Sequence, residues 1–177
     1  GEGSAPCGSA VKVHIPNAKL WSPNSPFLYD RKISWKENGK VVESITSYTA
    51  MREVGKMRDQ YGHLRATLNG EPIFMYGPLD QGWWPDGLYT APTDEALVWD
   101  IQLTKDLGFN TIRKHIKVEP ARWFYHCDRL GMLVWQDMPS GEQKRPYSWA
   151  RHQVNGGSDT ELTEEFKRNY YKEWGEI

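Results

Sequence analysis

The chain has 177 residues, which at about 150 residues per domain corresponds to one domain or two small ones and excludes a complete large multidomain enzyme. It carries 22 basic and 23 acidic residues and a formal net charge of −1, a balance that argues against nucleic acid as a partner. Its apolar runs are far shorter than a membrane span needs, so no membrane partner is expected. Because the first residue is Gly1 and the last residues show no helix stop, we expect the sequence to be an excerpt of a longer parent chain.

Aromatic residues are unusually frequent, with nine Trp and nine Tyr. Such side chains suit either a dense core or a flat stacking surface for sugars. The two cysteines, Cys7 and Cys127, lie far apart and indicate no disulfide framework. The cellular compartment stays open, with a periplasmic or extracellular location favoured.

The first part of the chain, to about Arg58, has the pattern of β-structure. Residues 29–35 alternate in polarity, and residues 41–49 are rich in β-branched side chains. Between them, Asn38 and Gly39 supply the two positive-φ residues of a tight hairpin turn. Since one hairpin is only marginally stable alone, we expect this part to be the last strands of a β-sandwich.

A second hairpin is predicted at Asn69 and Gly70, joining residues 63–68 to residues 72–76. The first strand of the second half is then expected to end at residues 75–77 and to open into a long aromatic and acidic loop.

Helical periodicity follows this loop. Thr93 is placed to cap a helix that Gly108 ends. The predicted buried stripe of this helix comprises Ala96, Leu97, Ile101, Leu103, Thr104 and Leu107. A short strand is expected at residues 109–113.

The same order of elements repeats once more. Pro120 is expected at the first position of a second helix, which Gly131 ends. Its apolar face holds Trp123, Phe124, Cys127 and Leu130. A strand at residues 132–136 follows, and a capping box at residues 158–161 precedes a third helix whose apolar positions are Leu162, Phe166, Tyr170 and Trp174.

Successive strand, helix, strand units with short connections predict parallel pairing. Either the opening of a (β/α)8 barrel or part of a doubly wound sheet would fit. A doubly wound sheet predicts a glycine-rich phosphate turn after its first strand, and the sequence contains neither that fingerprint nor a P-loop. The barrel is therefore favoured, and no cofactor is expected.

In such a barrel the site lies at the carboxyl ends of the strands. Charged side chains, amides and indoles follow the three predicted strands, an arrangement suited to a polyol ligand. The candidate substrate-binding residues are Asp80, Gln81, Trp83, Trp84, Arg113, His115 and Asp137. The five histidines show no metal-ligand spacing, so no metal site is expected.

Four sequence runs carry a resemblance to a known family. They are LWSPNSPFLY (residues 20–29), NGEPIFMYG (residues 69–77), DLGFNTIR (residues 106–113) and RWFYHCDRLGMLVWQD (residues 122–137). Together they resemble glycoside hydrolase family 2, the group of β-galactosidases, β-glucuronidases and β-mannosidases. The resemblance implies C-terminal strands of an immunoglobulin-like β-sandwich in residues 1–60, followed by the first three βα units of a (β/α)8 TIM barrel in residues 61–177.

Single positions follow from the same resemblance. It implies that Arg113 helps to shape a sugar subsite and that Asp137 ends the third strand with the family's acidic residue. His115 is displaced by one place from the family's histidine, and the loop at residues 79–84 departs from the common pattern. The identity of the β-glycoside substrate is therefore left open.

The family's mechanism, as the resemblance implies it, is retaining hydrolysis of O-glycosidic bonds by two Glu residues. One of them stands in an Asn-Glu pair, and no such pair occurs in the sequence. No catalytic residue is therefore assigned, and the excerpt alone is expected to be inactive although its parent is a glycosidase. The alternative is a noncatalytic carbohydrate-binding or structural module.

Each candidate also has a structural interpretation. Trp83 or Trp84 can anchor a loop instead of stacking on sugar, and Arg113 can pair with Asp80 or Asp137. For His126 a surface or structural role is expected. Two acidic residues are also given structural roles, Glu119 as part of a helix start before Pro120 and Glu142 in a solvated loop.

Overall fold

A computed structural model describes residues 1–139 and 164–176. The predicted capping box at residues 158–161, the apolar position Leu162 and the loop residue Glu142 lie outside this part of the chain. No helix in the described ranges has the length and apolar character to cross a membrane.

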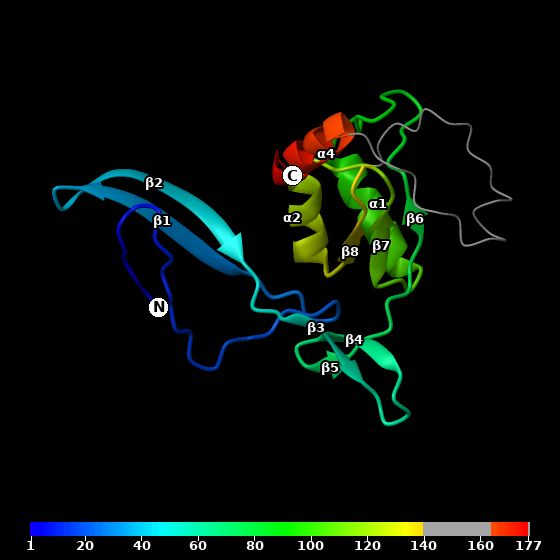
Figure 1. The fold of residues 1–177 in the computed structure, drawn as a ribbon, viewed down its shortest axis with the longest axis horizontal. Coiled ribbons are helices and arrows are strands. Elements are labelled where there is room, and N and C mark those ends of the chain that lie inside the picture. Colours follow the sequence, from blue (N-terminus) through cyan, green and yellow to red (C-terminus); the bar gives the residue numbers. More distant parts are fainter. Residues whose placement is uncertain (140–163, 177) are drawn as a thin grey trace, which may run out of the picture.

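The predicted first hairpin is confirmed. Strand β1 (Tyr29–Glu37) pairs antiparallel with β2 (Lys40–Thr49), and the hairpin extends away from the helices and the parallel sheet (Figure 1). Asn38 and Gly39 form the turn with φ values of 50° and 78°, as a two-residue turn of this type requires.

The second hairpin is confirmed at its turn but is shorter than predicted. Strand β4 (Leu64–Leu68) pairs with β3 (Val54–Arg58) and with β5 (Glu71–Pro72), and the Asn69 and Gly70 φ values are 54° and 85°. The predicted strand at residues 72–76 is wrong beyond Pro72. The reason is Asn110, whose side-chain amide donates to the Phe74 carbonyl and accepts from the Tyr76 amide, which draws this backbone to the neighbouring sheet.

Three parallel strands form that neighbouring sheet, in the order β6, β7, β8. They are β6 (Leu79–Asp80), β7 (Thr111–Lys114) and β8 (Leu133–Gln136). The parallel pairing predicted from the sequence is confirmed. The first strand was expected to end at residues 75–77, which is wrong by about three residues, because the Pro78 and Asp80 carbonyls still accept from Arg113 and His115.

Helix α1 (Asp94–Asp106) begins and ends as its sequence predicts. The Thr93 hydroxyl accepts a hydrogen bond from the Ala96 amide, and Gly108 takes a φ of 88° just after the helix. The predicted stripe is only partly right, since Leu97 and Ile101 are buried whereas Leu103 and Leu107 are exposed. Only one narrow face of α1 therefore packs on the sheet.

Helix α2 (Ala121–Leu130) begins one residue later than predicted. Pro120 is its N-cap residue, whereas the sequence predicted it as the first residue of the helix. Gly131 ends it in the left-handed region, as predicted. The third predicted helix is present as α4 (Glu164–Glu176), where the Tyr170 ring stacks between Phe166 and Trp174.

Helices α1 and α2 lie on one face of the parallel sheet (Figure 1). The core between them is apolar and consists of Leu97, Ile101, Ile112, Trp123, Cys127 and Met132. The opposite face of the sheet is open, and Leu79 and Trp135 are more than half exposed there.

Trp21 joins the N-terminal part of the chain to this unit. Its side chain is fully buried, and its indole N–H donates to the Asp128 carbonyl of α2 at 2.7 Å. The Trp21 carbonyl in turn accepts from the Asn69 side chain at 2.9 Å. Trp21 thus contacts the helical layer through its indole and the second hairpin through its backbone carbonyl.

Candidate functional site

The register of the parallel sheet divides the predicted site residues between two faces. Leu79, Arg113 and Trp135 are paired across the strands, and so are Asp80, Lys114 and Gln136. Because neighbouring residues of a strand point to opposite faces, the two rows face opposite ways. Arg113 is half exposed whereas Lys114 is almost fully buried, so the Arg113 row lies on the open face.

On the open face, Arg113 and Asp137 form a bidentate ion pair. The Arg113 Nε and Nη2 atoms donate to the two Asp137 carboxylate oxygens at 3.1 and 2.9 Å. This pairing holds the pKa of Asp137 below its usual range and raises the pKa of Arg113. Both groups are therefore charged at neutral pH, and the planar pair presents a donor and an acceptor side by side.

Gln81 and His115 form a second pair next to it. The Gln81 amide nitrogen lies 3.0 Å from the His115 Nδ1. Each residue lies two positions beyond a residue of the Arg113 row, at the carboxyl ends of β6 and β7. The structure thus brings four predicted site residues together in two pairs at this rim.

Behind the rim lies a buried charge cluster of Asp80, Lys114, Lys117 and Glu119. The Lys114 ammonium contacts the Asp80 carboxylate and donates to Glu119 at 2.9 Å, and Lys117 lies 3.0 Å from the same Glu119 oxygen. Lys114 also lies 4.6 Å from the centre of the Trp123 ring. The Glu119 side chain is only 3% exposed.

Sequence reasoning missed the role of Glu119, which it assigned to a helix start. A usable signal was the alternation of side chains along β7. It places Lys114 on the helix-covered face of the sheet, where a cation needs a buried acidic partner.

The aromatic loop after β6 places its two indoles differently. Trp83 is exposed and lies 4.3 Å from the Tyr89 ring, measured between ring centres. Trp84 is half-buried and packs against the hydrophobic core, and its indole N–H has no hydrogen-bond partner among the described residues. Trp83 is thus available to a ligand, whereas Trp84 anchors the loop.

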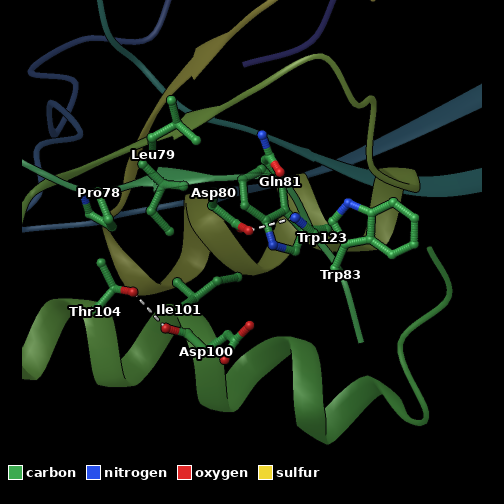
Figure 2. A pocket seen from close by; sticks show the side chains of 11 residues that line it. Pro78, Leu79, Asp80, Gln81, Trp83, Asp100, Ile101, Thr104 and Trp123 are labelled. Atoms are coloured by element: carbon green, nitrogen blue, oxygen red, sulfur yellow. Dashed lines mark hydrogen bonds between the residues drawn. The ribbon is translucent and has the colours of Figure 1, made fainter. Parts of the chain in front are cut away.

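A cavity of about 500 Å³ opens between the edge of β6 and helix α1 (Figure 2). Figure 2 shows Asp80 and Gln81 above it and Asp100 and Thr104 below, with Trp83 at one side. Burial, and then the nearby Asp80 carboxylate, raise the pKa of Asp100. Asp100 was not predicted from the sequence, because it looks like an ordinary polar position of a helix.

Of the surface and structural roles expected for His126, the structural one is found and the surface one is wrong. His126 is buried, its Nε2 lies 2.7 Å from the Asp94 carboxylate, and its Nδ1 accepts from Arg129. In the part of the chain that the structure describes, no three His, Cys, Asp or Glu side chains are grouped as metal ligands. Cys7 is exposed, and burial raises the pKa of the Cys127 thiol.

The chain is similar to known proteins over most of its length. Residues 3–52 match the profile of Glycosyl hydrolases family 2. A beta-galactosidase of Psychromonas ingrahamii is 31% identical over 124 residues, which are 70% of this chain and 11% of that protein. The chain spans between 11% and 18% of the length of the curated relatives it matches.

Solved structures show the same relationship. A GH2 beta-galacturonidase from Eisenbergiella tayi, bound to galacturonate, matches with a TM-score of 0.65 and 26% identity over 75% of this chain and 22% of that one. The beta-glucuronidase 3 of Bacteroides uniformis matches with a TM-score of 0.56 and 27% identity over 68% and 15% of the two chains. The sequence runs, the mixed strand and helix architecture and these matches show that the chain is related to glycosyl hydrolases family 2 and resembles a fragment of such a protein.

Proposed function

We propose that the protein to which this chain belongs is a retaining β-glycosidase that hydrolyses O-glycosidic bonds of carbohydrates. The observation that carries this proposal is the Arg113 and Asp137 ion pair on the open face, at the carboxyl ends of two parallel strands. Relatives named beta-galactosidase and structures named beta-glucuronidase and beta-galacturonidase support the activity class.

The architecture we propose divides the chain near residue 60. Residues 1–60 would end an immunoglobulin-like β-sandwich, and residues 61–177 would begin a TIM barrel. The β1 and β2 hairpin supports the first part, and the parallel β6, β7 and β8 with covering helices support the second. The β3, β4 and β5 sheet would connect the two domains, since it lies across the proposed boundary.

Within this function, the predicted site residues take two roles. Arg113, Asp137, Gln81, His115 and Trp83 would contact the sugar, because the polar pairs lie at the open rim and the indole is exposed. Vicinal hydroxyls suit a donor and an acceptor held in one plane. The two remaining candidates, Asp80 and Trp84, would instead support the site, because one belongs to the buried charge cluster and the other packs against the core.

Retention of configuration requires two carboxyl groups about 5–5.5 Å apart on either side of the scissile bond. We propose that the one standing in the family's Asn-Glu pair does not belong to this chain, because no such pair occurs in its sequence. The chain alone would then bind part of the sugar without hydrolysing it, and the remainder of the parent chain would be its partner.

A panel of aryl β-galactoside, β-glucuronide, β-galacturonide and β-mannoside tests the proposal on the full-length parent protein. We expect hydrolysis of at least one substrate with retained anomeric configuration, read by NMR of the first product. The same panel with the 177-residue chain should show no turnover. A parent that binds these sugars without cleaving any of them would support the noncatalytic binding module instead.

A further inference from the structure

The Lys117 side chain, which was not among the predicted site residues, forms hydrogen bonds with both ends of the aromatic loop. The Lys117 ammonium donates to the Gly82 carbonyl at 2.8 Å and to the Tyr89 carbonyl at 2.8 Å. These two carbonyls belong to the first and last residues of the loop segment 82–89. Lys117 therefore closes the segment much as a cross-link would, through hydrogen bonds.

The third partner of the ammonium is Glu119, at 3.0 Å. An ammonium has three donors, and all three of them have partners here. The Lys117 side chain is only 10% exposed and that of Glu119 only 3%. A buried lysine with three oxygen partners has one preferred position, and Glu119 is itself held by Lys114.

The close approach of the loop depends on Gly82. Its φ is 66°, and a Cβ built on it would lie 2.7 Å from the Lys117 Nζ. A side chain at this position would displace the ammonium from its carbonyl partners. The local sequence is thus fitted to the lysine.

The segment that Lys117 closes displays an aromatic pair. The Trp83 and Tyr89 rings lie 4.3 Å apart at an angle of 35°, and both side chains are about half exposed. Lys117 also lies 5.2 Å from the centre of the Tyr89 ring. Trp84, between the two, points to the core and fixes the middle of the segment.

We propose that Lys117 is a positioning residue that holds Trp83 and Tyr89 together as one stacking surface for a sugar ring of the substrate. The proposal rests on the glycosidase function proposed above and adds to it a surface and the residue that orders it. Fixing the rings before binding lowers the entropy that binding must overcome, so the effect of Lys117 should appear in substrate affinity.

The experiment uses the full-length protein with three variants, Lys117→Met, Lys117→Arg and Tyr89→Leu. Lys167→Met is the matched control, because Lys167 is a more exposed lysine of α4 whose ion pair with Glu164 is local. Two quantities are measured: hydrogen exchange of the amides of residues 82–90, and kcat and KM on the preferred aryl β-glycoside.

We expect Lys117→Met to speed amide exchange in this segment about tenfold and to raise KM about tenfold with kcat within about twofold. Lys117→Arg should recover part of both effects, because its guanidinium still donates to several oxygens. Tyr89→Leu keeps the backbone hydrogen bonds and should raise KM similarly, which also tests the surface if the lysine variant does not fold.

Unchanged amide exchange in Lys117→Met would overturn the proposal that Lys117 orders the loop segment 82–89. If Lys117→Met speeds amide exchange but neither Lys117→Met nor Tyr89→Leu changes KM, the proposal that Trp83 and Tyr89 bind the sugar is overturned. If the wild-type protein cleaves no glycoside, the proposed function fails, and titration calorimetry with the methyl β-glycosides then decides on the surface. A sugar affinity that Tyr89→Leu leaves unchanged, or no binding at all, would overturn it.

Discussion

The guanidinium of Arg52 and the carboxylate of Asp128 meet at 2.7 Å, although 76 positions separate them in the sequence. The same carboxylate accepts from the Tyr48 hydroxyl at 2.9 Å, and the Arg52 guanidinium lies 4.5 Å above the Trp21 ring. Asp128 of helix α2 thus contacts Tyr48 at the end of β2, Arg52 in the following segment and Trp21 in the N-terminal loop. This residue fixes the N-terminal part of the chain on the helical layer.

Removing the Asp128 carboxylate should therefore destabilise the protein. We expect Asp128→Ala to lower the free energy of unfolding by about 1.5–3 kcal/mol, since hydrogen bonds to a charged group are of this strength. Urea titration measures the change. The exposed ion pair of Lys167 and Glu164 is the control, and Lys167→Met should change stability by less than about 0.5 kcal/mol. Equal effects of the two variants would contradict the role of Asp128.

The Tyr48 hydroxyl predicts a stability change at alkaline pH. Burial, and then the hydrogen bond to Asp128, raise the pKa of Tyr48 to about 12 in the folded protein, against about 10 when unfolded. The folded state thus holds this proton more tightly, so the contribution is complete below about pH 10 and is lost as the pH rises toward about 12. Urea unfolding of wild type and Tyr48→Phe should show the stability difference shrinking between about pH 10 and about pH 12. A difference that stays constant with pH would count against the shifted pKa.

Local signals in the sequence predicted the turns and helix ends well. Asn38 with Gly39, Thr93 and Gly131 each act through their own backbone or through residues a few positions away, so a short stretch of sequence contains the whole cause. The parallel pairing of the strands followed from the repeated order of elements for a similar reason.

Which residues pair within the charge cluster could not be predicted in this way. Lys117 forms a hydrogen bond with the Gly82 carbonyl, which is 35 positions away in the sequence. Glu119 precedes Pro120 and looks like part of an ordinary helix start. The sequence also could not separate Trp83 from Trp84, because which indole faces the core depends on how the loop packs against residues distant in the sequence. Long-range contacts thus decided the part of the site that local patterns left open.

Gly77 predicts a steric limit at the edge of the parallel sheet. A Cβ on this residue would overlap the Thr111 carbonyl of β7. Gly77→Ala should therefore push the segment before β6 away from β7 and lower the free energy of unfolding by about 3 kcal/mol or more, at the upper end of overpacking effects. Gly175→Ala is the control: it lies in α4 with open space around it and should be neutral or stabilising by up to about 1 kcal/mol. Thermal unfolding of both variants distinguishes a steric cause from a general effect of alanine.

Arg113→Ala should separate activity from stability in the full-length protein. Arg113 is half exposed, and exposed ion pairs contribute only about 0–1 kcal/mol to folding. If the pair orients a sugar, its loss should lower kcat/KM at least about tenfold, which corresponds to about 1.4 kcal/mol of transition-state binding. Asp137→Asn, which keeps an oxygen acceptor, should lose less. Parallel losses of thermal stability and kcat/KM would favour a purely structural pair.

For Lys114 we expect a large loss of stability, in contrast to Arg113, because the Lys114 charge is buried. Lys114→Met retains the length of the side chain but leaves Asp80 without its lysine and Glu119 with Lys117 alone. Breaking a buried pair by removing one partner costs about 3–5 kcal/mol, so the midpoint of urea unfolding should fall far more than in Arg113→Ala. Adding Glu119→Gln to Lys114→Met leaves one carboxylate, Asp80, and one ammonium, Lys117, in the cluster, and should recover part of the loss because these two charges balance. A double variant that is less stable than Lys114→Met would show that Glu119 stabilises the fold through Lys117 and the loop, independently of Lys114.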